Sequence, residues 1–113
     1  EDLRTQFEAE LEEIVNATDL DVRNMSDTQI NKAARYLGYF WRHGQAIELY
    51  ETAMQIEDFQ GYLAMHHNLG RLYEDIREWE LAEARYQHLV GRGHSDYEKD
   101  VQRTKDKMLE DKK

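Results

Sequence analysis

Residues 66–86, HHNLGRLYEDIREWELAEARY, contain the pattern that decides the fold of this chain. Leu69, Leu72 and Tyr73 recur at the three- and four-residue steps of one helix face. After a polar stretch, Trp79 and Tyr86 belong to a second apolar stripe with the same period. The segment therefore predicts two helices, over about 60–75 and 78–91, joined by a short turn into a hairpin.

An earlier segment, residues 34–50, repeats this pattern as ARYLGYFWRHGQAIELY. Its Leu37-Gly38 pair lies 32 positions before Leu69-Gly70, whereas Tyr50 lies 36 positions before Tyr86. We interpret the difference as an internal turn that is four residues shorter in the first pair. The repeat predicts a second hairpin, with helices over about 28–42 and 45–57 and with Gly44 ending the first of them.

The glycines of the two Leu-Gly pairs are expected at close helix contacts. Each lies in the middle of a predicted helix, where Gly costs about 1 kcal/mol relative to Ala. Such a cost is tolerated where two backbones approach closely, here opposite Ala46 and Ala82. The large side chains expected to fill the space between the pairs are Trp41, Tyr50, Tyr73, Trp79 and Tyr86. The alternative is a simple helical bundle with two accidental Leu-Gly pairs.

The segments on either side of the hairpins are also predicted to be helical. Apolar residues from Leu3 to Val15 predict a helix over 2–16, followed by a long connection over 17–26. Ser26 with Gln29, and Ser95 with Glu98, fit the capping-box spacing, and the second pair opens a helix over 96–110. The six helices, with no strand pattern, predict an all-α fold in a single domain, 1–113.

The two hairpins resemble the tetratricopeptide repeat family over about residues 30–94. The second repeat, 60–94, carries the family's Leu-Gly pair and its Ala and Tyr positions, but His66 and His94 stand where Trp and Pro are frequent. The first repeat, 28–57, is degenerate. The resemblance implies a short right-handed α-solenoid, flanked by the acidic segment 1–27 and by a capping helix and tail over 95–113.

Composition limits the possible functions. The 113 residues carry a net charge of -9, contain no Cys, and include no run long and apolar enough to cross a membrane. Phosphate repels such an acidic chain, so we expect no nucleic-acid partner. Because no apolar run is long enough to span a bilayer, we expect no membrane partner and a cytoplasmic location. Ser26 and Ser95 are explained as helix caps, and no metal, nucleotide or nucleophile motif occurs. We expect no cofactor, no metal and no enzymatic activity.

The remaining functional candidate is a surface. In the tetratricopeptide repeat family, the first helix of each pair lines a concave groove that takes peptides or partner helices. All three cations of residues 28–57 fall on this face. The resemblance thus implies a cationic groove for an acidic or carboxylate-ended partner, as in a non-catalytic protein–protein interaction module. The predicted peptide-binding residues are Lys32, Arg35, Tyr39, Arg42, His67, Asn68 and Arg71, with Ala64, Glu74, Val101 and Lys105 beside them.

Several alternatives stay open at this point. The face could be merely solvated, or covered by the acidic first helix. The chain could also act structurally, by self-association or by docking within a larger protein through Tyr36, Phe40 or its first helix, as a monomer or weak homo-oligomer. A carboxylate clamp for chaperone tails is not expected, because only Arg35 and Asn68 match its five positions.

Overall fold

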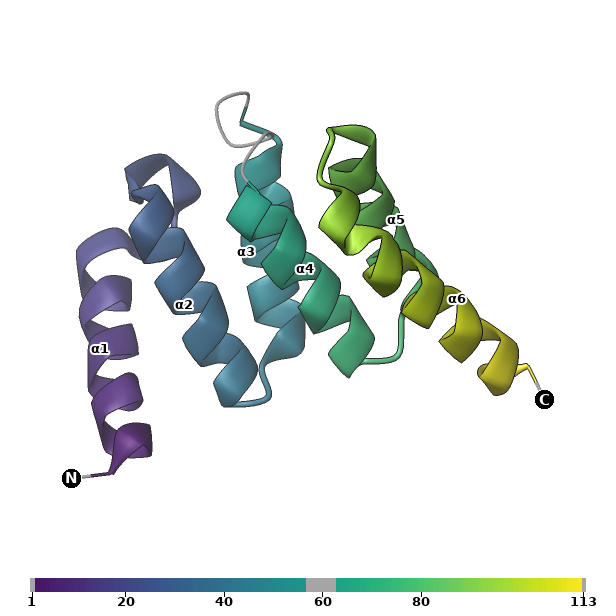
Figure 1. The fold of residues 1–113 in the computed structure, drawn as a ribbon. Coiled ribbons are helices and arrows are strands. Elements are labelled where there is room, and N and C mark those ends of the chain that lie inside the picture. Colours follow the sequence, from purple (N-terminus) through teal and green to yellow (C-terminus); the bar gives the residue numbers. More distant parts are fainter. Residues whose placement is uncertain (1, 57–62, 113) are drawn as a thin grey trace. The chain divides into compact units, whose positions relative to one another are not determined.

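A computed structural model describes residues 2–56 and 63–112, and α- and 3₁₀-helices are the only regular structure in these residues. The all-α prediction is therefore confirmed. The chain divides into two units, Glu1–Gly61 and Tyr62–Lys113. Each unit holds one helix hairpin and one flanking α-helix, and each is described by itself (Figure 1).

The first unit consists of α1 (Leu3–Thr18), the 3₁₀ turn η1 (Val22–Asn24), α2 (Asp27–Tyr39) and α3 (His43–Met54). Helices α2 and α3 form the hairpin, α1 packs against α2, and η1 packs against α3. The predicted capping box is confirmed, because Ser26 and Gln29 exchange side-chain to backbone hydrogen bonds at the start of α2. Helix α1 extends two residues beyond its predicted end.

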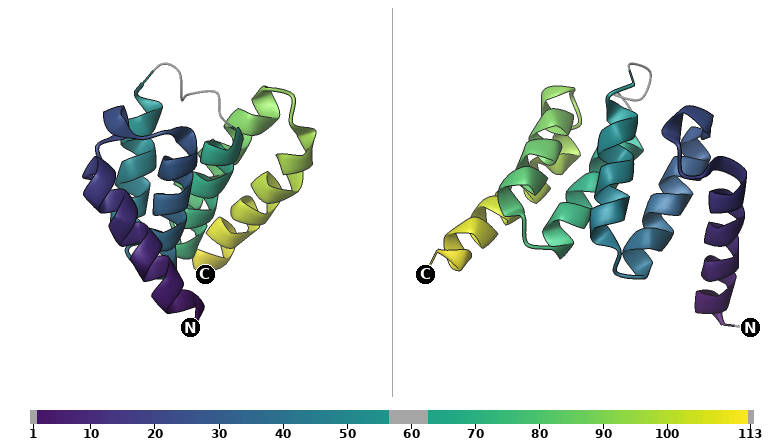
Figure 2. Two further views of the ribbon diagram at one scale, coloured as in Figure 1. Left: turned by 90° about the vertical axis from the view of Figure 1, so that its left-hand side faces the viewer. Right: turned by 180° about the vertical axis from the view of Figure 1, so that it is seen from behind.

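The second unit consists of α4 (Leu63–Asp75), α5 (Trp79–Gly91), the 3₁₀ turn η3 (Ser95–Tyr97) and α6 (Glu98–Asp111). Helix α5 packs against both α4 and α6, as the views in Figure 2 show. The predicted start of α4 at 60–62 lies outside the described residues. The capping box predicted at Ser95 is wrong: Ser95 opens η3, and no side chain caps α6.

The first hairpin turns at Trp41. The N–H of Trp41 donates to the carbonyl of Gly38 at 3.1 Å, and the N–H of Arg42 donates to that of Leu37 at 2.8 Å. This pair of bonds is the Schellman ending of a helix, which places one residue in the left-handed region. Trp41 is that residue, with φ 59°. Helix α2 therefore ends at Tyr39, before the predicted end at 42.

The second hairpin turns in the same way at Arg77, which has φ 63°. The backbone N–H of Arg77 donates to the carbonyl oxygen of Glu74 at 3.0 Å, and the N–H of Glu78 donates to the carbonyl oxygen of Tyr73 at 2.9 Å. Three residues separate the two helices in each hairpin. The prediction of a shorter first turn is therefore wrong, and Gly44 lies inside the first turn of α3 instead of ending α2.

Equal turns change which residues of the two hairpins correspond. Equivalent positions are 36 apart throughout, as predicted for Tyr50 and Tyr86. The position equivalent to Gly70 is thus Ala34, and the position equivalent to Gly38 is Glu74. The two Leu-Gly pairs are 32 positions apart, so they are displaced from each other by about one helical turn in the structural alignment. The features that do repeat are the turn geometry and the Ala and Tyr positions.

Gly70 does mark a close contact. A Cβ atom at Gly70 would lie 2.8 Å from ring atoms of Tyr86, which is fully buried. The neighbour that requires the glycine is thus the Tyr86 ring, and the prediction that Ala82 would be the closest partner is wrong. The absence of a side chain at Gly70 lets the buried Tyr86 ring pack closely against α4.

The predicted core residues are buried with one clear exception. Tyr50, Tyr73 and Tyr86 are at most 7% exposed, and Trp79 is partly exposed. Trp41 is 77% exposed, so the prediction that it fills the core is wrong. Trp41 follows the end of α2, and its left-handed backbone takes the side chain off the buried face.

Candidate peptide-binding surface

The seven predicted site residues belong to two units. Helix α2 carries Lys32, Arg35 and Tyr39, and Arg42 stands in the turn just before α3. The remaining three, His67, Asn68 and Arg71, lie on α4 of the second unit. The two sets are therefore considered separately.

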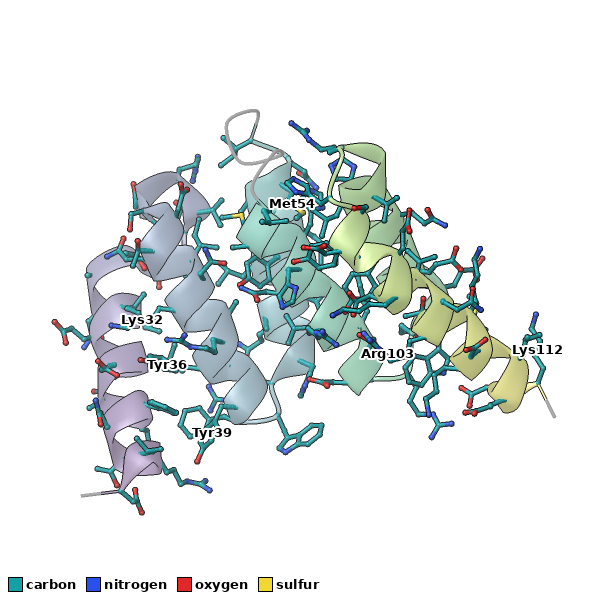
Figure 3. The ribbon with its side chains drawn as sticks, viewed as in Figure 1. Lys32, Tyr36, Tyr39, Met54, Arg103 and Lys112 are labelled. Atoms are coloured by element: carbon teal, nitrogen blue, oxygen red, sulfur yellow. The ribbon has the colours of Figure 1, made fainter. Side chains whose placement is uncertain are left out.

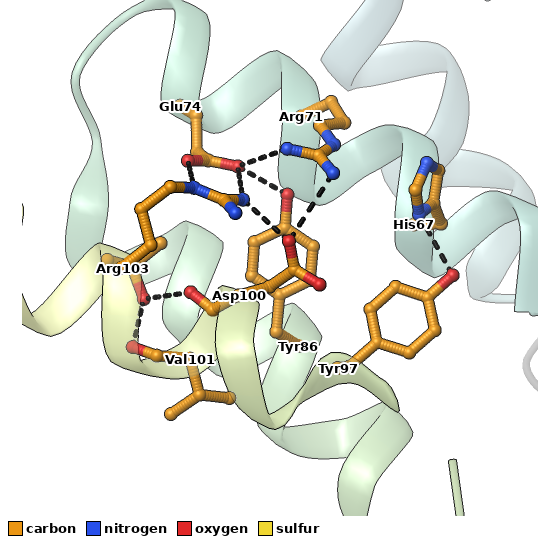
Figure 4. Close-up of polar contacts among 9 residues, drawn as sticks. His67, Arg71, Glu74, Tyr86, Tyr97, Asp100, Val101 and Arg103 are labelled. Carbon is orange, nitrogen blue, oxygen red and sulfur yellow. Dashed lines mark hydrogen bonds and ion pairs between the residues drawn. The ribbon is translucent and has the colours of Figure 1, made fainter. Parts of the chain in front are cut away.

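In the second unit, Arg71 is part of an ion-pair cluster (Figure 4). Its guanidinium lies 3.4 Å from Glu74 on its own helix and 3.3 Å from Asp100 on α6. The Arg71 side chain is 48% exposed, whereas that of Asp100 is only 3% exposed. Carboxylates of the chain itself thus already neutralise the strongest predicted anion ligand of α4.

Arg103 of α6 completes this cluster. Its Nε and Nη2 donate to the two carboxylate oxygens of Glu74 at 3.0 and 2.8 Å, and Nη2 also lies 2.7 Å from Asp100. Tyr86 donates its hydroxyl proton to Glu74. Burial alone would raise the pKa of Glu74, but the hydrogen bonds from Arg103 and Tyr86, together with the charge of Arg71, lower it below its usual value.

The cluster joins α6 to α4 and α5, and sequence reasoning missed its function in the fold. The signal available was the (i, i+3) spacing of two pairs, Arg71 with Glu74 and Asp100 with Arg103. Thr104, which is fully buried on α6, adds hydrogen bonds to the carbonyls of Asp100 and Val101. These contacts make the polar face of α6 part of the packed structure.

His67 is also engaged by its own unit. Its Nδ1 lies 2.9 Å from the hydroxyl of Tyr97, the last residue of η3, as Figure 4 shows. Burial, and next the positive charge of Arg71, lower the pKa of His67. The lowered pKa favours the neutral imidazole, so His67 contributes little positive charge to this face. Asn68 is half-buried on α4 beside it.

In the first unit, Lys32 and Tyr39 lie on the side of α2 that faces α1 (Figure 3). The Lys32 ammonium is 3.5 Å from Glu10 of α1, and the Tyr39 ring packs edge-on against Phe7 at a centroid distance of 5.1 Å. Tyr36 lies between them, stacks on Phe7 and donates its hydroxyl proton to Glu10. This hydrogen bond lowers the pKa of Glu10, and the charge of Lys32 contributes.

Tyr36 is thus not available as a docking residue. It is 2% exposed under α1, so the alternative in which Tyr36 contacts a partner is wrong. The alternative in which the acidic first helix covers the predicted binding face applies at Lys32, because Glu10 of α1 pairs with the Lys32 ammonium.

Arg35 and Arg42 differ from the other predicted cations. Both are exposed, and no ion pair involves either of them in the described part of the chain. The Arg35 guanidinium lies over the ring of Tyr36 at 5.5 Å, a cation–π contact that leaves its positive charge without a carboxylate partner in the described residues. Tyr39 is 49% exposed between them in the sequence. We refer to Arg35, Tyr39 and Arg42 as the arginine surface.

A separate hollow lies elsewhere on the first unit. A cleft of about 530 Å³ runs between residues 20–23 and the outer side of α3, and it shares no residue with the predicted site. Its single cation, Arg23, makes a bidentate pair with Asp21. The cleft therefore offers no unpaired positive charge to an acidic ligand.

Other kinds of site were sought in the same residues. Across 2–56 and 63–112, no group of three or more His, Cys, Asp or Glu residues could hold a metal ion. Nor does any described helix have the length and apolar character needed to span a membrane.

Comparisons with protein-family models, with curated proteins and with solved structures found no match to this chain. The tetratricopeptide resemblance therefore stays a prediction, and function must be argued from the surfaces described above.

Proposed function

We propose that this chain is a non-catalytic protein–protein interaction module whose arginine surface, in the first unit, binds an acidic peptide segment. The observation that carries the proposal is that two exposed arginines have no ion-pair partner in the described residues. Arg35 and Arg42 are exposed and unpaired within the described residues, although the chain has a net charge of -9. In such a chain carboxylates are plentiful, so cations kept apart from them are suited to an external anion.

The chemistry of these residues also favours a carboxylate ligand. A guanidinium offers N–H groups in a planar fork that matches a carboxylate, and the half-exposed ring of Tyr39 adds an apolar wall with a hydroxyl. Arg, Tyr and Trp are the residue types that most often dominate binding at protein interfaces. His67 and Arg71 do not belong to this surface, because Tyr97 of η3 contacts His67 and Asp100 of α6 pairs with Arg71.

The test measures binding of a fluorescein-labelled peptide rich in Asp and Glu by fluorescence anisotropy at low and at physiological salt. The Arg35→Glu/Arg42→Glu variant is expected to bind at least tenfold more weakly than the unmodified chain, because two attractive charges become repulsive. The matched control combines Arg85→Glu on α5 with Arg92→Glu just after it, because these arginines also lack ion pairs in the described residues but belong to the second unit and have no exposed tyrosine like Tyr39 between them in the sequence. An equal loss in both variants would reduce the effect to net charge and contradict the proposal.

A second candidate is a structural function in which the flanking helices satisfy the cations in cis. The pairs Glu10–Lys32 and Asp100–Arg71 favour it, because each joins a flanking helix to a hairpin of the same unit. Under this hypothesis the chain assembles or docks without an acidic ligand. Light scattering that finds a concentration-dependent dimer, unaffected by the arginine variants, would favour this candidate over the first.

A further inference from the structure

We propose that Trp41 is the apolar anchor of the arginine surface, and that the acidic segment bound there carries an aliphatic or aromatic side chain beside its carboxylates. The inference rests on the proposed function and specifies its ligand.

The backbone of Trp41 is in an unfavourable region for its residue type. Its φ of 59° is common for Gly or Asn, whereas a bulky residue pays a steric penalty there. The same turn is closed by Gly93 at the end of α5, with φ 97°, and by Arg77 in the second hairpin. The turn requires a left-handed residue but not a tryptophan, so the fold alone does not explain the indole.

The exposure of Trp41 gives no structural compensation either. The residue is 77% exposed, although burial of apolar area is the main contribution that an indole makes to stability. Non-glycine residues with left-handed backbone are concentrated in proteins at ligand-contacting positions. The combination of strain and exposure at a single large aromatic residue therefore points to a partner that covers it.

The ring of Trp41 is nevertheless supported. It lies against the imidazole of His43 at a centroid distance of 4.7 Å with a tilt of 39°, and His43 is only 6% exposed at the start of α3. Because the Trp41 ring already packs against the buried His43 imidazole, it loses less rotational freedom on binding than a freely rotating side chain would. Trp41 is thus presented to solvent in a restricted orientation.

The neighbours of Trp41 fix the sign of the partner's charge. Tyr39 and Phe40 pack edge-to-face at 5.1 Å, and the guanidinium of Arg4 lies over Phe40 at 5.7 Å. With Arg42 adjoining Trp41 in the sequence, aromatic rings and guanidinium groups alternate at this end of the first unit. Aromatic rings with arginines can also bind single-stranded nucleic acid, but the net charge of -9 disfavours a polyphosphate over a short acidic peptide.

The test uses two labelled acidic peptides that differ only in a central Leu or Ala, and measures both dissociation constants. The unmodified chain is expected to bind the Leu peptide at least tenfold more tightly. In Trp41→Gly this ratio is expected to fall to about one, while the urea midpoint of unfolding stays equal or rises, because Gly suits the left-handed backbone. Leu81→Ala, at a 47% exposed position on α5, is the control and should keep the ratio.

Each outcome separates the two proposals. If both peptides bind the unmodified chain equally, or if Trp41→Gly keeps the ratio, the anchor is overturned while the proposed function stands. A lower urea midpoint for Trp41→Gly also overturns it, because the indole would then be holding the turn. If neither peptide binds, the proposed function fails and the anchor fails with it. Tighter binding of an oligothymidine that is lost in Trp41→Gly replaces the acidic segment by nucleic acid.

Discussion

The two hairpins have the same backbone turn and opposite electrostatics. Arg35 on α2 and Arg71 on α4 occupy equivalent positions, 36 residues apart. Arg71 contacts Glu74 and Asp100, whereas Arg35 has no ion pair in the described residues, because the position equivalent to Glu74 is Gly38. The two arginines therefore differ in their carboxylate partners: Arg71 has one on its own helix and one on α6, and Arg35 has neither in the described residues.

Removing Arg103 should have the largest effect. Arg103→Ala leaves the carboxylates of Glu74 and Asp100, whose side chains are 13% and 3% exposed, with Arg71 as their one remaining ion-pair partner in the described residues, while Tyr86 still donates to Glu74. Uncompensated buried carboxylates are costly, so we expect a loss of roughly 3 kcal/mol in the free energy of unfolding. Arg35→Ala in the first hairpin should change this free energy by less than about 0.5 kcal/mol. Urea unfolding of both variants checks the contrast, and similar losses would contradict it.

Gly70→Ala should destabilise the second hairpin. Its new methyl group would meet the Tyr86 ring at 2.8 Å, and this overpacking outweighs the helix propensity gained, for a net loss of about 1–2 kcal/mol. A Cβ atom at Gly44 in α3 would meet no other element within 4 Å among the described residues, so Gly44→Ala should instead gain up to about 1 kcal/mol. Thermal unfolding measured by circular dichroism checks both signs. A stabilising Gly70→Ala would mean that Tyr86 can move away.

Acid should weaken the second hairpin through Glu74. Because the folded state lowers the pKa of Glu74, the unfolded state binds its proton at a higher pH. The stabilisation is therefore complete above the ordinary Glu pKa of about 4.3, and it is lost as the pH falls through the lower folded value. Urea midpoints between pH 7 and pH 3 should decline less steeply for Glu74→Gln than for the unmodified chain. Equal slopes would assign the acid sensitivity to other carboxylates.

The smallest expected change in stability comes from transferring the acid to the first hairpin. Gly38→Glu places a carboxylate three residues after Arg35, as Glu74 follows Arg71; relative to Gly38→Gln, which gains similar helix propensity, the added helix-surface pair is worth about 0.2–0.5 kcal/mol. It should also weaken binding of the Asp- and Glu-rich peptide, because Arg35 is then neutralised in cis. Gly38→Gln is the uncharged control in the anisotropy assay. Equal affinities for the two variants would show that Arg35 does not contact the peptide.

The sequence predicted the elements well because apolar spacing and caps are local signals. The Ser26 box and the stripes of α4 and α5 predicted helices that the structure confirms within a few residues. The turns were placed less well. Schellman endings are recognised by Gly, and here Trp41 and Arg77 hold the left-handed position, so the end of α2 was placed too late and the Leu-Gly pairs were aligned incorrectly.

The candidate site could be predicted only in part, because ion pairing depends on contacts between helices. Helix periodicity put Arg35 and Arg71 on comparable faces, and both positions are in fact equivalent. No local pattern indicates that Asp100, 29 residues after Arg71, lies within reach of its guanidinium. Which cations are paired depends on how α6 packs within its own unit and how α1 packs on α2, and the sequence pattern does not give this packing.

The shared turn has one more consequence. Its backbone bonds are the same whether an indole or a guanidinium projects from the left-handed residue, so the hairpin tip can change its chemistry without rebuilding the helices beneath it. Grafting tyrosine, lysine or asparagine at that corner would display a different recognition group on an unaltered scaffold. The tip is therefore the natural point at which to diversify this fold in a library.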